Sequence, residues 1–100
     1  MTKRYKGWPD KLPILDEKDL CRGRYDSVDG RHCLMGWAIV CFDESSFETT
    51  EDFLTKLYCH CYGERIAQFN DNRKNSLKQV AKAWNDTIKE LGYTVICSRD

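Results

Sequence analysis

An uninterrupted apolar run over residues 33–42, CLMGWAIVCF, constrains this chain more than any other feature. The run carries no charged side chain, although 32% of the 100 residues are charged. Leaving it in water would forfeit about 1.5–3 kcal/mol for each large side chain. We therefore expect it to be the core element that the other elements cover. A segment that is apolar throughout does not distinguish helix from strand by periodicity, but ten residues exceed a usual strand and favour a helix.

The length and charge of the chain limit its class. One hundred residues make one domain, 1–100, and a domain of this size buries about 60–70% of its unfolded surface. Sixteen basic and sixteen acidic residues cancel, which argues against a nucleic-acid partner. No run reaches the ~18–20 apolar residues of a membrane span, and the N-terminus lacks the apolar centre of a signal peptide. We expect a cytoplasmic protein with no membrane partner.

Two further helices are predicted. Ser76 and Gln79 have the spacing of a capping box, an apolar stripe follows, and Gly92 suits a left-handed C-cap, so residues 76–91 are predicted to be an amphipathic helix. A second helix is expected near 50–62, closed by Gly63, with a face of five apolar residues. Its candidate N-caps are Ser45, Ser46, Thr49 and Thr50, and its apolar face comprises Phe53, Leu54, Leu57, Tyr58 and Cys61.

The remaining segments are short. Residues 1–13 contain two prolines and predict an irregular arm, and residues 14–20 predict a short helix. Residues 66–69 predict an apolar turn, 70–75 a polar connector, and 93–97 a short extended tail. The fold class is therefore a mainly α, compact small domain of about three to four helices.

The cysteines and histidines raise the question of metal or thiol chemistry. In a reducing cytosol the six cysteines are expected to be buried thiols rather than disulfides. Cys59 and Cys61 are two residues apart, and a helix would turn their sulfurs about 200° from each other, away from a shared ion. We predict no metal and no cofactor. The open alternative is a metal-dependent or small-ligand enzyme that uses Cys21 or Cys33 with His32 or His60.

Candidate binding residues have structural alternatives. An anion-binding surface could be formed by Arg22, Arg24 and Arg31 with Tyr25. We favour the alternative, in which these arginines pair with Asp26, Asp29 and Asp71. Asn70 and Asp71 suit a turn or cap. Asn85 and Asp86 are expected to face water. The binding candidates are Trp8, Arg22, Arg24, Asp43, Glu44, Glu48, Asn70 and Asp71, of which Trp8 would more simply pin the arm and the acidic residues form a solvated face.

Several short motifs are shared with a known group of proteins. Cys21-x-Gly23, the Asp29-Gly30 turn, Cys33-x-x-Gly36-x-Ala38 and Ile66-x-x-x-Asn70-Asp71 precede the amphipathic helix. This pattern, over about residues 20–91, resembles an uncharacterised family of short phage and bacterial proteins. Trp37, between Gly36 and Ala38, departs from the family pattern. The resemblance implies a mostly helical fold and a phage or bacterial cytosolic setting, and it implies no activity.

The sequence favours a small non-enzymatic binding protein. No glycine-rich phosphate loop or recognisable catalytic constellation is present. Together with the resemblance, this suggests a phage accessory factor that binds and modulates a host protein, such as a bacterial defence component. The alternatives are the Cys/His enzyme above and a nucleic-acid-binding module supported only by local basic residues.

Overall fold

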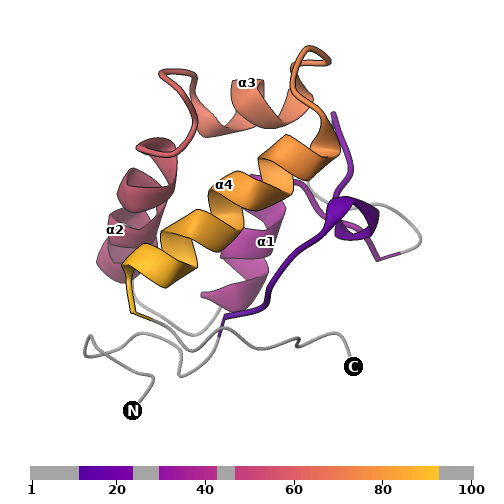
Figure 1. Cartoon of the computed structure of the whole chain (residues 1–100). Coiled ribbons are helices and arrows are strands. Elements are labelled where there is room, and N and C mark those ends of the chain that lie inside the picture. Colours follow the sequence, from indigo (N-terminus) through magenta and orange to yellow (C-terminus); the bar gives the residue numbers. More distant parts are fainter. Residues whose placement is uncertain (1–11, 24–29, 43–46, 93–100) are drawn as a thin grey trace.

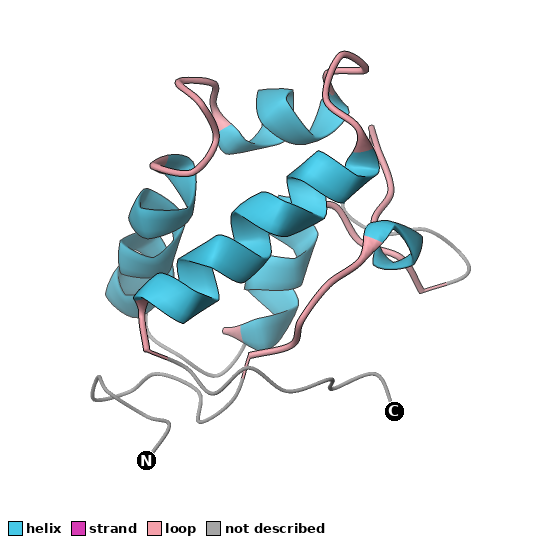
Figure 2. Ribbon diagram, in the orientation of Figure 1, coloured by secondary structure: helices cyan, strands magenta, loops and turns pink. Residues whose placement is uncertain are grey.

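The computed structural model describes residues 12–23, 30–42 and 47–92, and these fold as a helical domain (Figures 1 and 2). Within these ranges there is no β-strand, only an isolated parallel bridge between Leu20 and His32. The predicted mainly α class is therefore confirmed. The elements are the short 3-10 helix η1 (Glu17–Asp19) and the α-helices α1 (Leu34–Cys41), α2 (Phe47–Tyr58), α3 (Ile66–Asp71) and α4 (Leu77–Glu90).

Some sequence predictions fall outside the described residues. They concern most of the N-terminal arm, the tail over 93–97 and two of the proposed α2 caps. Four of the candidate binding residues are also outside, namely Trp8, Arg24, Asp43 and Glu44.

The apolar run forms helix α1, as predicted, and α4 crosses it in Figure 1. The helix begins after Cys33, whose Sγ accepts a hydrogen bond from the Gly36 N–H at 3.3 Å. Leu34 and Ala38 are fully buried, whereas Ile39 and Val40 are 49% and 50% exposed. The run is therefore a core element as expected, but other elements do not cover Ile39 and Val40. Helix α1 is apolar on all sides, but only the side that faces the neighbouring elements is packed. Its opposite side stays accessible to solvent.

Helix α4 has the predicted start and apolar stripe. The Gln79 N–H donates to Ser76 Oγ at 3.1 Å, and the Ser76 N–H donates to Gln79 Oε1 at 3.3 Å, which completes the capping box. After the helix, Gly92 has φ +86°, the left-handed conformation that glycine adopts without steric cost. The buried residues of the helix are Val80, Ala81, Ala83, Trp84, Thr87 and Ile88.

Helix α2 joins the core through aromatic rings. The ring of Phe53 lies 4.8 Å from that of Phe42 and 5.1 Å from that of Trp84, so it links α1, α2 and α4. The predicted bounds were shifted, because the helix covers Phe47–Tyr58 rather than 50–62. Thr49 and Thr50 consequently lie inside the helix and do not cap it. Tyr58, assigned to the apolar face, is 45% exposed.

The segment after α2 differs from the prediction. Residues predicted as an apolar turn and the start of a polar connector form helix α3, which includes Asn70 and Asp71. Ile66 and Phe69 are three residues apart, so a helical turn buries both on one side. This burial favours the helix, and Gly63, at φ +84°, reverses the chain before it.

The N-terminal segment packs along α4 and runs antiparallel to it (Figure 1). Trp84 Nε1 donates to the Pro13 carbonyl at 2.7 Å. The Asn85 side chain accepts from Leu15 N at 2.9 Å and donates to Leu15 O at 2.8 Å. Asn85 therefore does not simply face water as predicted. Of the helix predicted over 14–20, only the single turn η1 forms.

Candidate functional site

Three sequence motifs meet in one place, which we call the polar junction and define as Cys21, Arg22, Gly23, Cys33, Asn70 and Asp71. Asn70 is its centre and is 0% exposed. Its Oδ1 accepts from the Leu34 N–H at 3.0 Å, and its Nδ2 donates to the Cys21 carbonyl at 2.9 Å. The Leu34 N–H belongs to the first turn of α1 and has no partner within that helix. Asn70 thus caps α1 from 36 residues away in the sequence.

Arg22 binds the chain around the end of α3. Its Nη1 donates to the carbonyls of Asn70 at 3.1 Å and Asn72 at 2.8 Å, and its Nη2 donates to the Asn75 carbonyl at 2.6 Å. Carbonyls at a helix C-terminus carry partial negative charge, which favours a guanidinium there. The favoured prediction was pairing with aspartates, but these contacts are to backbone oxygens. Asp71 Oδ1 instead accepts from the Gly23 N–H at 2.9 Å.

Both thiols of the junction, Cys21 and Cys33, are buried. Burial raises the pKa of Cys33, and the nearby Asp71 carboxylate raises it further, against hydrogen bonds that lower it. Cys21 donates through Sγ to the Arg31 carbonyl at 3.7 Å. A nucleophilic cysteine requires a thiolate. The junction therefore has the chemistry of a structural clamp, and Arg22, Asn70 and Asp71 are used within the fold.

The second cysteine cluster lies in the turn after α2, not in the helix assumed from the sequence. Cys61 is buried and donates to the Leu57 carbonyl at 3.3 Å, and burial raises its pKa to about 12. Cys59 is exposed. His60 Nε2 lies 2.7 Å from Glu90 Oε1 of α4. In the described part of the chain, no three His, Cys, Asp or Glu side chains are placed to share a metal ion.

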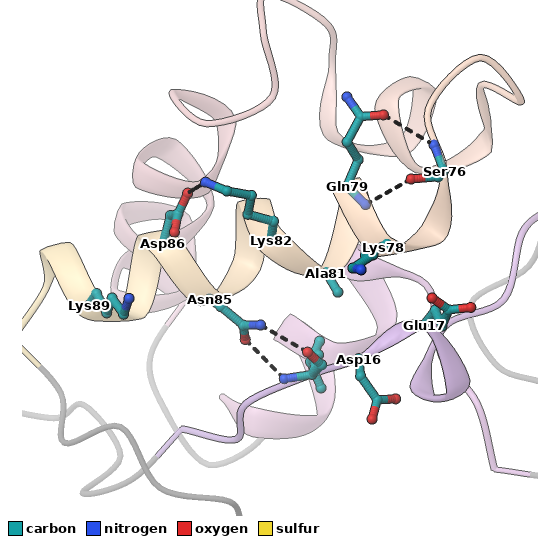
Figure 3. Close-up of a pocket in the computed structure, with 11 residues that line it drawn as sticks. Asp16, Glu17, Ser76, Lys78, Gln79, Ala81, Lys82, Asn85, Asp86 and Lys89 are labelled. Carbon is teal, nitrogen blue, oxygen red and sulfur yellow. Dashed lines mark hydrogen bonds and ion pairs between the residues drawn. The ribbon is translucent and has the colours of Figure 1, made fainter.

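A solvent-open groove lies between the N-terminal segment and α4 (Figure 3). Its volume is about 640 Å³. One wall is the segment around Asp16 and Glu17, and the other is the outer side of α4. Asn85 joins the two walls through its bonds to Leu15. The residues that line the groove are Leu15, Asp16, Glu17, Ser76, Lys78, Gln79, Ala81, Lys82, Asn85, Asp86 and Lys89.

The charges of the groove fall into two groups. Lys82 Nζ pairs with Asp86 Oδ2 at 2.6 Å, and this hydrogen bond is the main reason that the Lys82 pKa is raised. Asp16 Oδ1 accepts from the Lys18 N–H at 2.9 Å and caps η1. By contrast, the side chains of Lys78, Lys89 and Glu17 make no ion pair or hydrogen bond with the described residues.

Sequence reasoning found the junction residues but missed the groove. Arg22, Asn70 and Asp71 come together, while exposed Glu48 lies in the first turn of α2. The signal for the groove was present in the lysines of α4. Lys78, Lys82 and Lys89 are spaced by four and seven residues, which places them in one row along the helix.

Comparisons with known proteins add no relative. No protein-family model, no curated protein and no solved structure matches the chain. Among the described helices, none has the length and apolar character needed to cross a lipid bilayer.

Proposed function

We propose that this chain is a small non-enzymatic binding protein that holds another protein in the groove along α4. The observation that carries the proposal is the groove itself, about 640 Å³ of open space lined by charged side chains of both signs. Mixed charge around a central hollow is suited to a protein surface, because complementary charges align two partners.

The use of the motif residues within the fold supports a binding role over a catalytic one. Cys33 and Cys61 are buried thiols with raised pKa values, and Asn70 is enclosed by hydrogen bonds to the backbone. These side chains stabilise the domain. In the groove, Lys78, Lys89 and Glu17 make no bond with the described residues and remain available to a partner.

The partner that we propose is a host protein. This part of the proposal depends on the resemblance to short phage and bacterial proteins, whose setting would make the chain a phage accessory factor in the host cytoplasm. A component of a bacterial defence system is the class of host protein that such a factor would modulate or inhibit.

The experiment is to block the groove without touching α4. The variant Glu17→Trp replaces an exposed residue of the groove wall with a bulky indole ring, which occupies the groove. Each protein is immobilised and exposed to host lysate. We expect the Glu17→Trp variant to capture about tenfold less partner than the unmodified chain, or still less.

The matched control is Glu51→Trp, which makes the same substitution at an exposed position of α2 outside the groove. Its recovery of partner should equal that of the unmodified chain, and circular dichroism should show equal helix content in all three proteins. Equal recovery by Glu17→Trp and Glu51→Trp would contradict the proposal, as would an unmodified chain that retains nothing above a blank resin.

A further inference from the structure

Cys21 and Cys33 are neighbours in register across the isolated parallel bridge. The Cys21 N–H donates to the His32 carbonyl at 3.2 Å, and the His32 N–H donates to the Asp19 carbonyl at 3.1 Å. These bonds pair Leu20 with His32. Cys21 and Cys33 each follow one member of this pair, so they lie opposite each other. Because successive side chains point to opposite faces, both thiols are on the face that Leu20 and His32 leave.

Two further contacts fix the spacing of the two cysteines. In a continued ladder, the Leu34 N–H would donate to the Cys21 carbonyl. The Asn70 amide lies between these two groups instead, accepting from the first at 3.0 Å and donating to the second at 2.9 Å. Paired strands lie about 4.8 Å apart, and a disulfide joins Cα atoms that are about 4.4–6.8 Å apart. The register therefore places the two cysteines within the range that a disulfide spans.

The two sulfurs lie beside the same segment of chain. Cys21 is 7% exposed and Cys33 is 6% exposed, and both are thiols in this structure. Cys21 Sγ lies 3.7 Å from the Arg31 carbonyl, so it reaches toward the segment that carries Cys33. Cys33 Sγ is turned toward α1, where it accepts from the Gly36 N–H at 3.3 Å. Rotation of the two side chains about their Cα–Cβ bonds is the change that a bond between the sulfurs requires.

We propose that Cys21 and Cys33 are a redox-sensitive pair, which hydrogen peroxide converts into a disulfide within the folded chain. This inference concerns the polar junction and is independent of the groove and its partner. The bond would join the start of α1 to the segment after η1. A cross-link restricts the unfolded chain, so the oxidised protein should unfold at a higher urea concentration than the reduced protein.

The reaction has two steps. The thiolate of one cysteine attacks the peroxide, so that an S–O bond forms, the O–O bond breaks, and the departing hydroxide takes up the thiol proton to become water. The second thiolate attacks the sulfur of this sulfenic acid, the S–S bond forms, and the S–O bond breaks to release a second water. Two thiols are oxidised and one peroxide is reduced. Burial, which raises the pKa of Cys33, slows attack on the peroxide, whereas the second step is favoured by proximity.

The test is prolonged oxidation of the full chain by dilute hydrogen peroxide under native conditions, followed by alkylation and tryptic digestion without reductant. Trypsin cleaves after Lys18, Arg22 and Arg31, so the proposed bond joins peptide 19–22 to a peptide that begins at His32. Fragmentation of the linked peptides then distinguishes Cys33 from Cys41. We expect at least about tenfold more of this link than of any other cysteine pair. Dithiothreitol should remove the link and restore the urea midpoint.

The matched control is Cys59→Ser, which removes an exposed thiol outside the junction. Peroxide should produce the same link in this variant and raise its urea midpoint as in the unmodified chain, but it should leave the midpoint of Cys21→Ser unchanged. Oxidation in concentrated urea, where the register is lost, should give a mixture of pairs.

Three results would overturn the proposal. The first is a different predominant pair in the folded chain, such as Cys33 with Cys41. The second is retention of both junction thiols after Cys59 has been oxidised. The third is a disulfide-linked chain that unfolds at the same or a lower urea concentration, because such a bond would not fit the register.

Discussion

Asn70 connects segments that are far apart in the sequence. Its amide bonds to the N-terminus of α1 and to the Cys21 carbonyl, and it sits in α3 with no exposed surface. A side chain that offers both a donor and an acceptor is needed here, because an N–H and a carbonyl must be satisfied together. Within the described chain, no buried side-chain nitrogen or oxygen lacks a partner.

Replacing this side chain should be costly. Asn70→Ala leaves the Leu34 N–H and the Cys21 carbonyl without their partner in a buried place, so we expect a loss of about 2–4 kcal/mol of unfolding free energy. Urea unfolding followed by circular dichroism measures it. Gln68→Ala removes an exposed amide from the same helix and should change stability by less than about 0.5 kcal/mol. Equal losses in the two variants would show that the junction does not stabilise the domain.

At the scale of elements, the turn before α3 is joined to the turn before α4. Glu64 Oε1 accepts from Asn72 Nδ2 and its Oε2 accepts from Asn75 Nδ2, both at 3.1 Å. Hydrogen bonds to a carboxylate favour its charged form. They lower the pKa of Glu64 below its ordinary value of 4.5.

This shift predicts a dependence of stability on pH. Because the pKa of Glu64 is lower in the folded chain, its contribution is complete above the unfolded value of 4.5 and is lost as the pH falls through the folded value. Glu64→Gln should therefore flatten the decline of stability at acidic pH. Urea midpoints between about pH 2 and pH 6 measure the slope. The comparison is Glu51→Gln on the exposed side of α2, and identical slopes for the two variants would contradict the assignment.

How well the sequence predicts each element depends on whether the interactions that stabilise it join residues close together or far apart in the sequence. Helix α4 carries its own signals, since the Ser76–Gln79 box and the apolar stripe are local. Helix α3 is six residues long and is stabilised by burial of Phe69 and Asn70 against other elements. The contacts of Arg22 and Asn85 were not predictable, because their partners lie 48 to 53 and 70 positions away. Composition and periodicity contain no information about such pairings.

At the scale of the whole molecule, the groove exists because the N-terminal segment is attached to α4. Leu12 and Leu15 supply the apolar anchors and are 1% and 2% exposed. Trp84 and Asn85 supply the polar attachments, to Pro13 and Leu15. The wall that carries Asp16 and Glu17 is thus positioned by two adjacent residues of α4.

Removing one attachment should loosen that wall. In Asn85→Ala, the Leu15 N–H and carbonyl lose their partner, so we expect the Leu15 amide to exchange with solvent faster and the domain to lose about 1–3 kcal/mol. Hydrogen exchange by NMR measures the first effect and urea unfolding the second. Lys89→Ala, on the same side of α4 but without such a bond, should leave Leu15 exchange unchanged. Unchanged exchange in Asn85→Ala would show that the segment is held by its leucines alone.

The position of the α1 cap has a consequence for synthesis of the chain. A ribosome makes residues 33–42 before residue 70, and α3 must also leave the exit tunnel before Asn70 can reach the Leu34 N–H. Until then, the most apolar segment of the protein lacks its distant cap, and the ring of Trp84 that packs against Phe53 has not yet left the tunnel. The nascent chain therefore presents this segment during elongation, and we expect chaperones that recognise apolar stretches to bind it at that stage.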